Sequence, residues 1–152
     1  MIDSTEMKTS INESIRWLIR RDLEDVIQID DVGYVEPWSE SKFISTLRKN
    51  SVIGVVATNG FNRPIGFCLY ELKKTQIEIL RMAVSPQWRR KGVASAMIER
   101  LKDRVLNRKR SGIVCDVDGH SVFAQYCFND NGFTGHAIAD DRILFLWERD
   151  ND

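Results

Sequence analysis

The N-terminal third of the chain changes from a strand pattern to a helix pattern. Apolar side chains occupy every second position within residues 14–20, which is typical of a half-buried strand. Helical spacing follows, and Asp22 has the residue type of an N-cap for a helix that reaches about residue 32. Residues 33–38 are expected to form a loop, after which the hydroxyl of Ser39 caps a second helix.

Three consecutive apolar segments in the middle of the chain favour strands. Turn sequences separate them, namely Asn59-Gly60 and residues 73–75. An antiparallel meander is the simplest arrangement of such segments. The segments are 52–58, 64–72 and 76–84.

Beyond the third of these strands the spacing of apolar residues lengthens again. It predicts a helix from about Trp88 or Arg89 to Asn107. A shorter helix is expected over residues 121–129, and Gly132 is expected to follow its end in the left-handed conformation. Short strands over 112–117, 133–136 and 142–147 complete the chain. This order predicts an α/β (α+β) fold, in which helices pack on a mixed sheet.

Length and charge limit the classes of function. A chain of 152 residues, 43% of them hydrophobic, suits one compact domain, which we expect to span residues 14–150 after a polar tail, 1–13. The 22 basic residues equal the 22 acidic ones, so no overall charge attracts nucleic acid or an anionic membrane. The tail has no apolar run, so neither a secretory signal nor a membrane anchor is expected.

The three cysteines predict a reducing environment. Cys68, Cys115 and Cys127 are an odd number, lie in apolar segments and form no C-x-x-C pair. Reduced thiols in a cytoplasmic protein fit this pattern better than disulfide bonds. None of the three has the spacing of a metal ligand, so no metal site is expected.

The basic stretch Arg89-Arg-Lys-Gly-Val-Ala94 stands between a strand and a helix. Amide groups in the first turn of a helix have no intrahelical partner and favour an anion there, a phosphate above all. Gly92 and Ala94 lack bulky side chains that would keep a phosphate away from the backbone. The residues alone leave two interpretations open, a phosphate cradle and a solvated basic turn.

A longer motif around this stretch resembles a known family. Residues 78–84 (EILRMAV), Ser85-Pro86 and residues 89–94 (RRKGVA) are similar to the acetyl-CoA signature of GNAT superfamily N-acetyltransferases. The resemblance implies a mixed, mostly antiparallel central sheet of about seven strands with about four flanking helices. Pro37-Trp38-Ser39 followed by Phe43 is similar to the ribosomal-protein alanine N-acetyltransferases within that superfamily.

The resemblance also implies a binding site for acetyl-CoA as co-substrate. Backbone amides from Arg90 to Ser95 would hold the pyrophosphate, and the strand 82–84 would splay from residues 112–117 to receive the pantetheine arm. An amide near Met82 would polarise the thioester carbonyl. The implied cofactor contacts are Met82, Ala83, Val84, Arg89, Arg90, Lys91, Gly92, Val93, Ala94, Ser95, Ser121 and Phe128.

Two carboxylates are candidates for the base that deprotonates the amine. Glu78 lies fourteen residues before Gly92, where many family members have a catalytic glutamate, and strand alternation predicts that it shares a face with Leu80 and Met82. Asp116 falls where the alanine N-acetyltransferases have a glutamate base. Either residue has the alternative of being a solvated carboxylate near a strand end.

The chain departs from the family at the position of the general acid. The family tyrosine that faces the thiolate lies five residues before the phenylalanine of the Gly-Phe pair, and here that position is Phe128. Tyr126 is two residues away, roughly 200° around a helix, so it is not a simple substitute. The thiolate then leaves unprotonated or meets water, the enzyme is weaker than its relatives, or the domain binds the cofactor without catalysis.

The expected partner is an amine acceptor, first of all a protein N terminus. Trp38 and Glu36, with Tyr34 in the same loop, are candidates for the acceptor groove, although Trp38 is equally suited to an aromatic contact under the loop. A small-molecule amine is the second candidate acceptor, and a non-catalytic acyl-CoA-binding regulatory domain is the rival class. A monomer and a homodimer are both compatible with the sequence.

Overall fold

The computed structural model describes residues 14–150, and the predicted tail, residues 1–13, lies outside this part of the chain. Seven strands form one sheet in the order β1-β2-β3-β4-β5-β7-β6. Adjacent strands are antiparallel except β4 and β5, which are parallel. The strands are β1 (Ile15–Trp17), β2 (Val52–Thr58), β3 (Pro64–Leu72), β4 (Gln76–Val84), β5 (Gly112–Asp118), β6 (Thr134–Ala139) and β7 (Arg142–Glu148).

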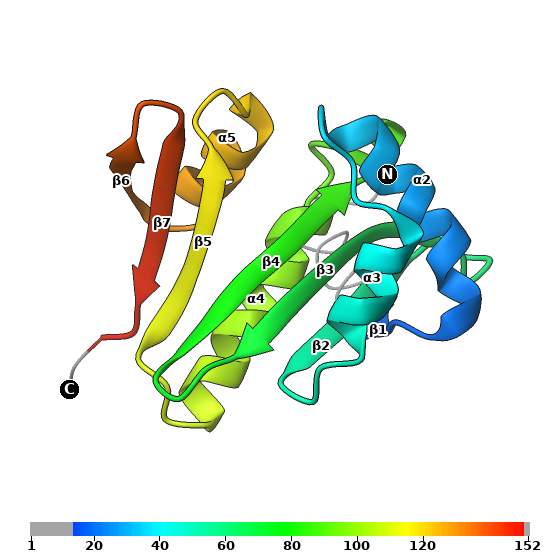
Figure 1. The fold of residues 1–152 in the computed structure, drawn as a ribbon. Helices are drawn as coiled ribbons and strands as arrows, with labels where there is room; N and C mark the ends of the chain where they lie inside the picture. Colours follow the sequence, from blue (N-terminus) through cyan, green and yellow to red (C-terminus); the bar gives the residue numbers. More distant parts are fainter. Residues whose placement is uncertain (1–13, 151–152) are drawn as a thin grey trace, which may run out of the picture.

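Four α-helices cover the two faces of this sheet (Figure 1). The helices α2 (Leu23–Gly33) and α3 (Glu40–Leu47) pack on one face, and α4 (Val93–Asn107) and α5 (Val122–Asp130) on the other. Short 3-10 turns, η1 (Arg20–Asp22) and η2 (Pro86–Trp88), precede α2 and α4. The predicted fold class, a mostly antiparallel mixed sheet with about four helices, is confirmed.

Each face has its own apolar core. On the α2–α3 face, helix residues such as Val26 and Phe43 pack on Phe67 and Leu69 of β3. On the other face, the apolar side of α4 packs on β3, β4 and β5, and α5 joins through Cys127 and Phe128. The α4 stripe predicted from sequence is buried: Ala94, Met97, Ile98, Leu101 and Val105.

Local hydrogen bonding accounts for the places where the predicted helix starts were wrong. The helix after β4 begins at Val93, because η2 and two left-handed residues, Arg90 (φ 61°) and Gly92 (φ 84°), interrupt the backbone before it. Asp22 precedes α2 without capping it. Its carboxylate instead accepts the Ile19 N–H at 2.8 Å and two bonds from Arg16.

The other predicted helix signals are realised. The Ser39 hydroxyl accepts the Lys42 N–H at 3.1 Å and caps α3. Gly132 follows α5 in the predicted left-handed conformation, with a φ of 83°. The Ser121 hydroxyl also caps α5 through the Ala124 N–H, a role that was not predicted. The first strand is shorter than predicted, because the chain turns into η1 after Ile19.

A β-bulge at Leu80 interrupts β4. Leu69 of β3 faces Arg81 and Tyr70 faces Ile79, so Leu80 has no partner in the register. Leu80 consequently packs with the α2–α3 core, whereas Met82 lies in the core under α4. The prediction that Glu78 shares a face with both residues was wrong, because the bulge breaks the alternation between them.

Candidate active site

The centre of the sheet opens between β4 and β5. The two strands pair only from Gln76 to Ile79 and from Gly112 to Cys115, and both continue beyond this segment. Figure 1 shows them diverging toward their carboxyl ends. The bulge at Leu80 lies where the pairing stops, and such bulges bend and twist a strand locally. Backbone groups near the end of β4 therefore face an opening instead of a neighbouring strand.

The N terminus of α4 lies beside this opening. Its first turn leaves the N–H groups of Val93, Ala94 and Ser95 without intrahelical partners, since the Ala96 N–H is the first to bond back, to Gly92 O at 2.9 Å. The left-handed Gly92 directs the chain into this turn. Residues 89–91 lie in the loop before the helix, so their side chains add positive charge around the row of amides.

Arg89 connects the loop to β4. Its Nε donates to the carbonyl oxygen of Val84 at 3.2 Å, and its guanidinium lies over the ring of Phe123 with a carbon-to-centroid distance of 5.3 Å. The Val84 carbonyl, which was predicted to face the pantetheine arm, is therefore already hydrogen-bonded. Lys91 lies over Trp88 at 5.4 Å.

A pocket of about 620 Å³ lies between the start of α4 and the exposed side of α5. It brings together seven of the predicted cofactor residues: Val84, Arg89, Arg90, Gly92, Val93, Ala94 and Ser95. It also contains six residues that were not predicted: Trp88, Val122, Phe123, Tyr126, Cys127 and Asp130. Val122, Tyr126 and Asp130 recur every fourth residue, so the helical spacing of α5 is the signal from which this face could have been identified.

Phe128 does not contribute to this pocket. It is 2% exposed, and its ring centroid lies 5.0 Å from that of Phe133 and 5.3 Å from that of Phe145. The aromatic core therefore holds this ring, and the contact between Phe128 and the cofactor stays a prediction. Tyr126, which is 69% exposed, lines the pocket instead. The Ser121 hydroxyl accepts the capping bond from the Ala124 N–H at 3.2 Å.

The two candidate bases lie on neighbouring strands at the closed end of the opening. Glu78 is directly opposite Val114, two residues before Asp116 on β5, so regular alternation places both carboxylates on one face of the sheet. Each has a cationic partner. An Oε atom of Glu78 lies 3.7 Å from the Lys73 ammonium, and an Oδ atom of Asp116 lies 2.7 Å from the Arg142 guanidinium.

The loop after α2 places Tyr34 against Met82. The Tyr34 hydroxyl donates to the Met82 carbonyl oxygen at 2.6 Å and accepts a longer bond from the Met82 N–H at 3.5 Å. Burial raises the pKa of Tyr34 to about 12, although the nearby Arg81 charge and the bond to Met82 act in the opposite direction. Met82 and Ala83 are themselves buried.

A buried ion pair holds this loop. Both oxygens of the fully buried Asp30 carboxylate accept from Arg81, at 2.6 Å from Nε and 3.0 Å from Nη2. Asp30 also accepts the Trp38 N–H at 2.8 Å, and Arg81 donates to the carbonyl oxygen of Glu36 at 3.1 Å. The Arg81 guanidinium covers the Tyr34 ring at 3.3 Å. No local sequence pattern identifies this pair, because its members are 51 residues apart.

The candidate acceptor residues differ in exposure. Trp38 packs against Phe43 with a centroid distance of 5.2 Å and joins the α2–α3 core, so it makes the aromatic contact that was considered as an alternative role. Glu36 is exposed, and the structure ties its backbone to Arg81.

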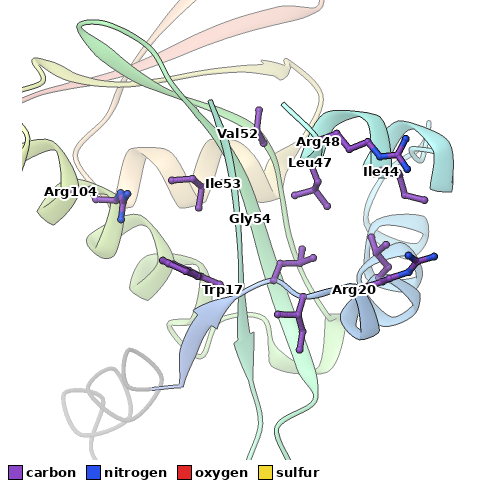
Figure 2. Close-up of a pocket in the computed structure, with 12 residues that line it drawn as sticks. Trp17, Arg20, Ile44, Leu47, Arg48, Val52, Ile53, Gly54 and Arg104 are labelled. Atoms are coloured by element: carbon purple, nitrogen blue, oxygen red, sulfur yellow. The ribbon is translucent and has the colours of Figure 1, made fainter. Parts of the chain in front are cut away.

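A second pocket, of about 650 Å³, lies at the other side of the molecule (Figure 2). Trp17, Ile53 and Leu47 contribute to its largely apolar wall, and Arg104 lies at its margin. The described residues that line it include no carboxylate, cysteine or histidine. Neither of the two candidate bases, Glu78 and Asp116, is among these lining residues.

Two further observations concern metals and membranes. Within residues 14–150, no cluster of three or more histidine, cysteine or acidic side chains is arranged to bind a metal ion. No helix in this part of the chain has the length and apolarity needed to cross a membrane.

Comparison with known proteins identifies the family of the chain. The model of the acetyltransferase (GNAT) family matches residues 12–133. This match confirms the resemblance of residues 78–94 and, at the level of the family, the expectation of an acetyl-CoA-dependent acyltransferase. No curated protein matches the chain.

Solved structures share the fold at low sequence identity. The ribosomal-protein-S18-alanine N-acetyltransferase from Escherichia coli is 20% identical, with a TM-score of 0.77 over 88% of this chain and 92% of that one. Ard1 from Thermoplasma volcanium is 22% identical, with a TM-score of 0.75 over 89% and 95%. NAA60 from Arabidopsis thaliana, solved in complex with acetyl-CoA, is 16% identical, with a TM-score of 0.74 over 88% and 97%.

Proposed function

Because the chain belongs to the acetyltransferase (GNAT) family, we propose that it transfers an acetyl group from acetyl-CoA to a primary amine. The preferred acceptor is the α-amine of a protein N terminus, as the name of the similar alanine N-acetyltransferase from Escherichia coli indicates for that enzyme. The reaction runs through a ternary complex in the cytoplasm, where the three buried cysteines remain free thiols.

The observation that supports this proposal most directly is the opening between β4 and β5 beside an unpaired helix N terminus. The residues present fit acetyl-CoA. Amides of residues 93–95 would hold phosphate oxygens, and Arg90 and Lys91 would add charge. Gly92 has a positive φ, which would strain a residue with a side chain. The absence of a side chain also leaves the amides of the first helical turn open to a phosphate.

The rest of the site supports amine chemistry. Acetyl-CoA supplies an activated thioester when it is bound, and the Met82 N–H would polarise its carbonyl group. Glu78 and Asp116 are the candidate bases for the acceptor amine, which must be neutral to attack. Both lie on the face covered by α2 and α3, the same face from which the loop of residues 33–38 approaches the opening.

The test combines cofactor binding with product formation. The protein is first titrated with CoA in a calorimeter, then incubated with acetyl-CoA and a panel of N-terminal peptides and polyamines. Release of free thiol, together with an acetyl mass increase on one acceptor, is the expected result. Acetylation of polyamines alone would assign the small-molecule acceptor. Failure to bind CoA would overturn the proposal altogether.

Single variants distinguish the two candidate bases. Loss of the base should move the activity optimum to higher pH, where more of the amine is already neutral. We expect this shift for Glu78→Gln or for Asp116→Asn. The matched control is Glu99→Gln, which removes an exposed carboxylate from α4. An unchanged pH profile in both test variants would show that neither carboxylate is the base and that water deprotonates the acceptor amine.

A non-catalytic acyl-CoA-binding domain is the second candidate function. Two observations favour it, since Phe128 lies in the core and the Ser121 hydroxyl is used as a helix cap. These are the positions where the family has a tyrosine and an asparagine. Tight CoA binding without thiol release from any acceptor would establish this function and reject the transferase.

A further inference from the structure

The Tyr34 hydroxyl occupies a specific place in the opening of the sheet. It contacts both backbone polar groups of Met82, and in a strand the N–H and C=O of one residue point to the same side. Because β3 lies along the other edge of β4, these groups face the side on which β5 has diverged. The hydroxyl therefore lies against the edge of β4 that faces the opening.

The hydrogen-bonding capacity of this hydroxyl is only partly used. A tyrosine hydroxyl has one proton to donate and lone pairs to accept with. Its proton is committed to the Met82 carbonyl at 2.6 Å, and the bond that it accepts from the Met82 N–H is long, 3.5 Å. The raised pKa, about 12, keeps the hydroxyl protonated wherever an amine substrate is neutral. An N–H group entering the opening would meet an oxygen that can accept.

The surroundings hold Tyr34 in this orientation. The Arg81 guanidinium lies 3.3 Å from the ring centroid, and Arg81 is itself fixed by the two bonds to Asp30. The Tyr34 N–H bonds to the Asp30 carbonyl oxygen at 3.0 Å, which places the residue directly after α2. Ring and backbone are thus both restrained, so little rotamer freedom remains to be lost when a substrate binds.

We propose that the Tyr34 oxygen accepts a hydrogen bond from the acceptor amine and orients its nitrogen toward the acyl group at Met82. This inference rests on the proposed function and adds to it a positioning residue and a physical basis for the choice of amine. A neutral primary amine has two N–H groups, of which one goes to the base and the other to Tyr34. A secondary amine has one, so it cannot satisfy both partners. The enzyme should therefore select primary amines and reject N-methylated or N-terminal proline acceptors.

Tyr34→Phe tests the assignment, because it removes the oxygen and keeps the ring stacked on Arg81. Loss of one net hydrogen bond should raise the KM for the amine acceptor about 3- to 10-fold. The affinity for CoA, measured by calorimetry, should remain within a factor of about two of that of the unmodified protein. A dead-end complex of CoA and acceptor peptide gives a readout without turnover, and the variant should bind the peptide more weakly by the same factor. Tyr70→Phe, a hydroxyl deletion in the core under α4, is the matched control.

Selectivity between amines provides a second, independent measurement. The unmodified protein should acetylate a peptide with a free N terminus faster than its N-methyl counterpart. Tyr34→Phe should reduce the ratio of these two rates by about 3- to 10-fold, the same factor by which it raises KM. If the site excludes the methyl group by steric hindrance instead, Tyr34→Phe would leave the ratio of rates unchanged, and the role of the Tyr34 oxygen would be rejected. An unmodified protein that accepts both peptides equally would overturn the proposal. Thiol release in that case would still uphold the transferase, whereas release from no acceptor would reject the proposed function itself.

Discussion

Replacing Arg81 by methionine removes the guanidinium that faces the buried Asp30 carboxylate. Asp30 is 0% exposed and has three hydrogen bonds, two of them from Arg81 and one from the Trp38 N–H. A buried charge that loses its partner typically destabilises a protein by about 3–5 kcal/mol. For a domain of this size that corresponds to a fall in Tm of roughly 6–20 °C. Urea unfolding followed by tryptophan fluorescence and circular dichroism measures the change in the free energy of unfolding.

Two further variants make the reasoning falsifiable. Adding Asp30→Asn to Arg81→Met removes the unpaired charge and keeps an acceptor for Trp38, so the double variant should regain at least half of the lost stability. Arg63→Met breaks the exposed ion pair with Asp25 and should cost at most about 1 kcal/mol. If Arg81→Met costs no more than Arg63→Met, the buried pair does not hold the loop and our explanation of Tyr34 placement is wrong.

Three other predictions concern single groups. Gly92→Ala should cost about 1–2 kcal/mol in urea unfolding, because its φ is 84°, and should weaken CoA binding in calorimetry; normal affinity would contradict the phosphate cradle. Burial raises the pKa of Asp22, but bonds from Arg16 and the Ile19 N–H outweigh it and lower the net value, so its stabilisation is present above the usual aspartate pKa and is lost as pH falls. Asp22→Asn should therefore flatten the acid limb of stability against pH, and an unchanged slope would refute this assignment. Burial raises the pKa of Cys127 to about 12, so its labelling by a thiol reagent should require unfolding, and rapid native labelling would disprove that.

Much of the fold was predictable because local patterns and tertiary packing agree. Three apolar segments within residues 52–84, with turn sequences between them, predicted the three-stranded meander, and the apolar stripe of α4 is the face that is buried. The cap at Ser39 was recognised because a hydroxyl and a backbone N–H three residues away form a local unit. The wrong assignments, at Asp22 and at the start of α4, arise where a competing bond or a left-handed residue replaced the expected local interaction.

The candidate site was only partly predictable. Residues 89–95 were identified because the strand, the glycine and the helix that form the cradle are contiguous in sequence. The β-bulge at Leu80 was not visible in the alternation, although it changes which face Met82 occupies. Phe128 was placed by counting along a family pattern, and only its packing on other rings showed that it belongs to the core.

By itself, the sequence determined the elements, the family motif and the acetyl-CoA signature, because these depend on residues close together along the chain. The tertiary structure decided which polar groups meet in the opening between β4 and β5. Asp30 and Arg81 pair across 51 residues, and through them Tyr34 reaches Met82. Such a contact forms only after the sheet has brought α2 beside β4, since no local periodicity specifies which distant charge a buried carboxylate will meet.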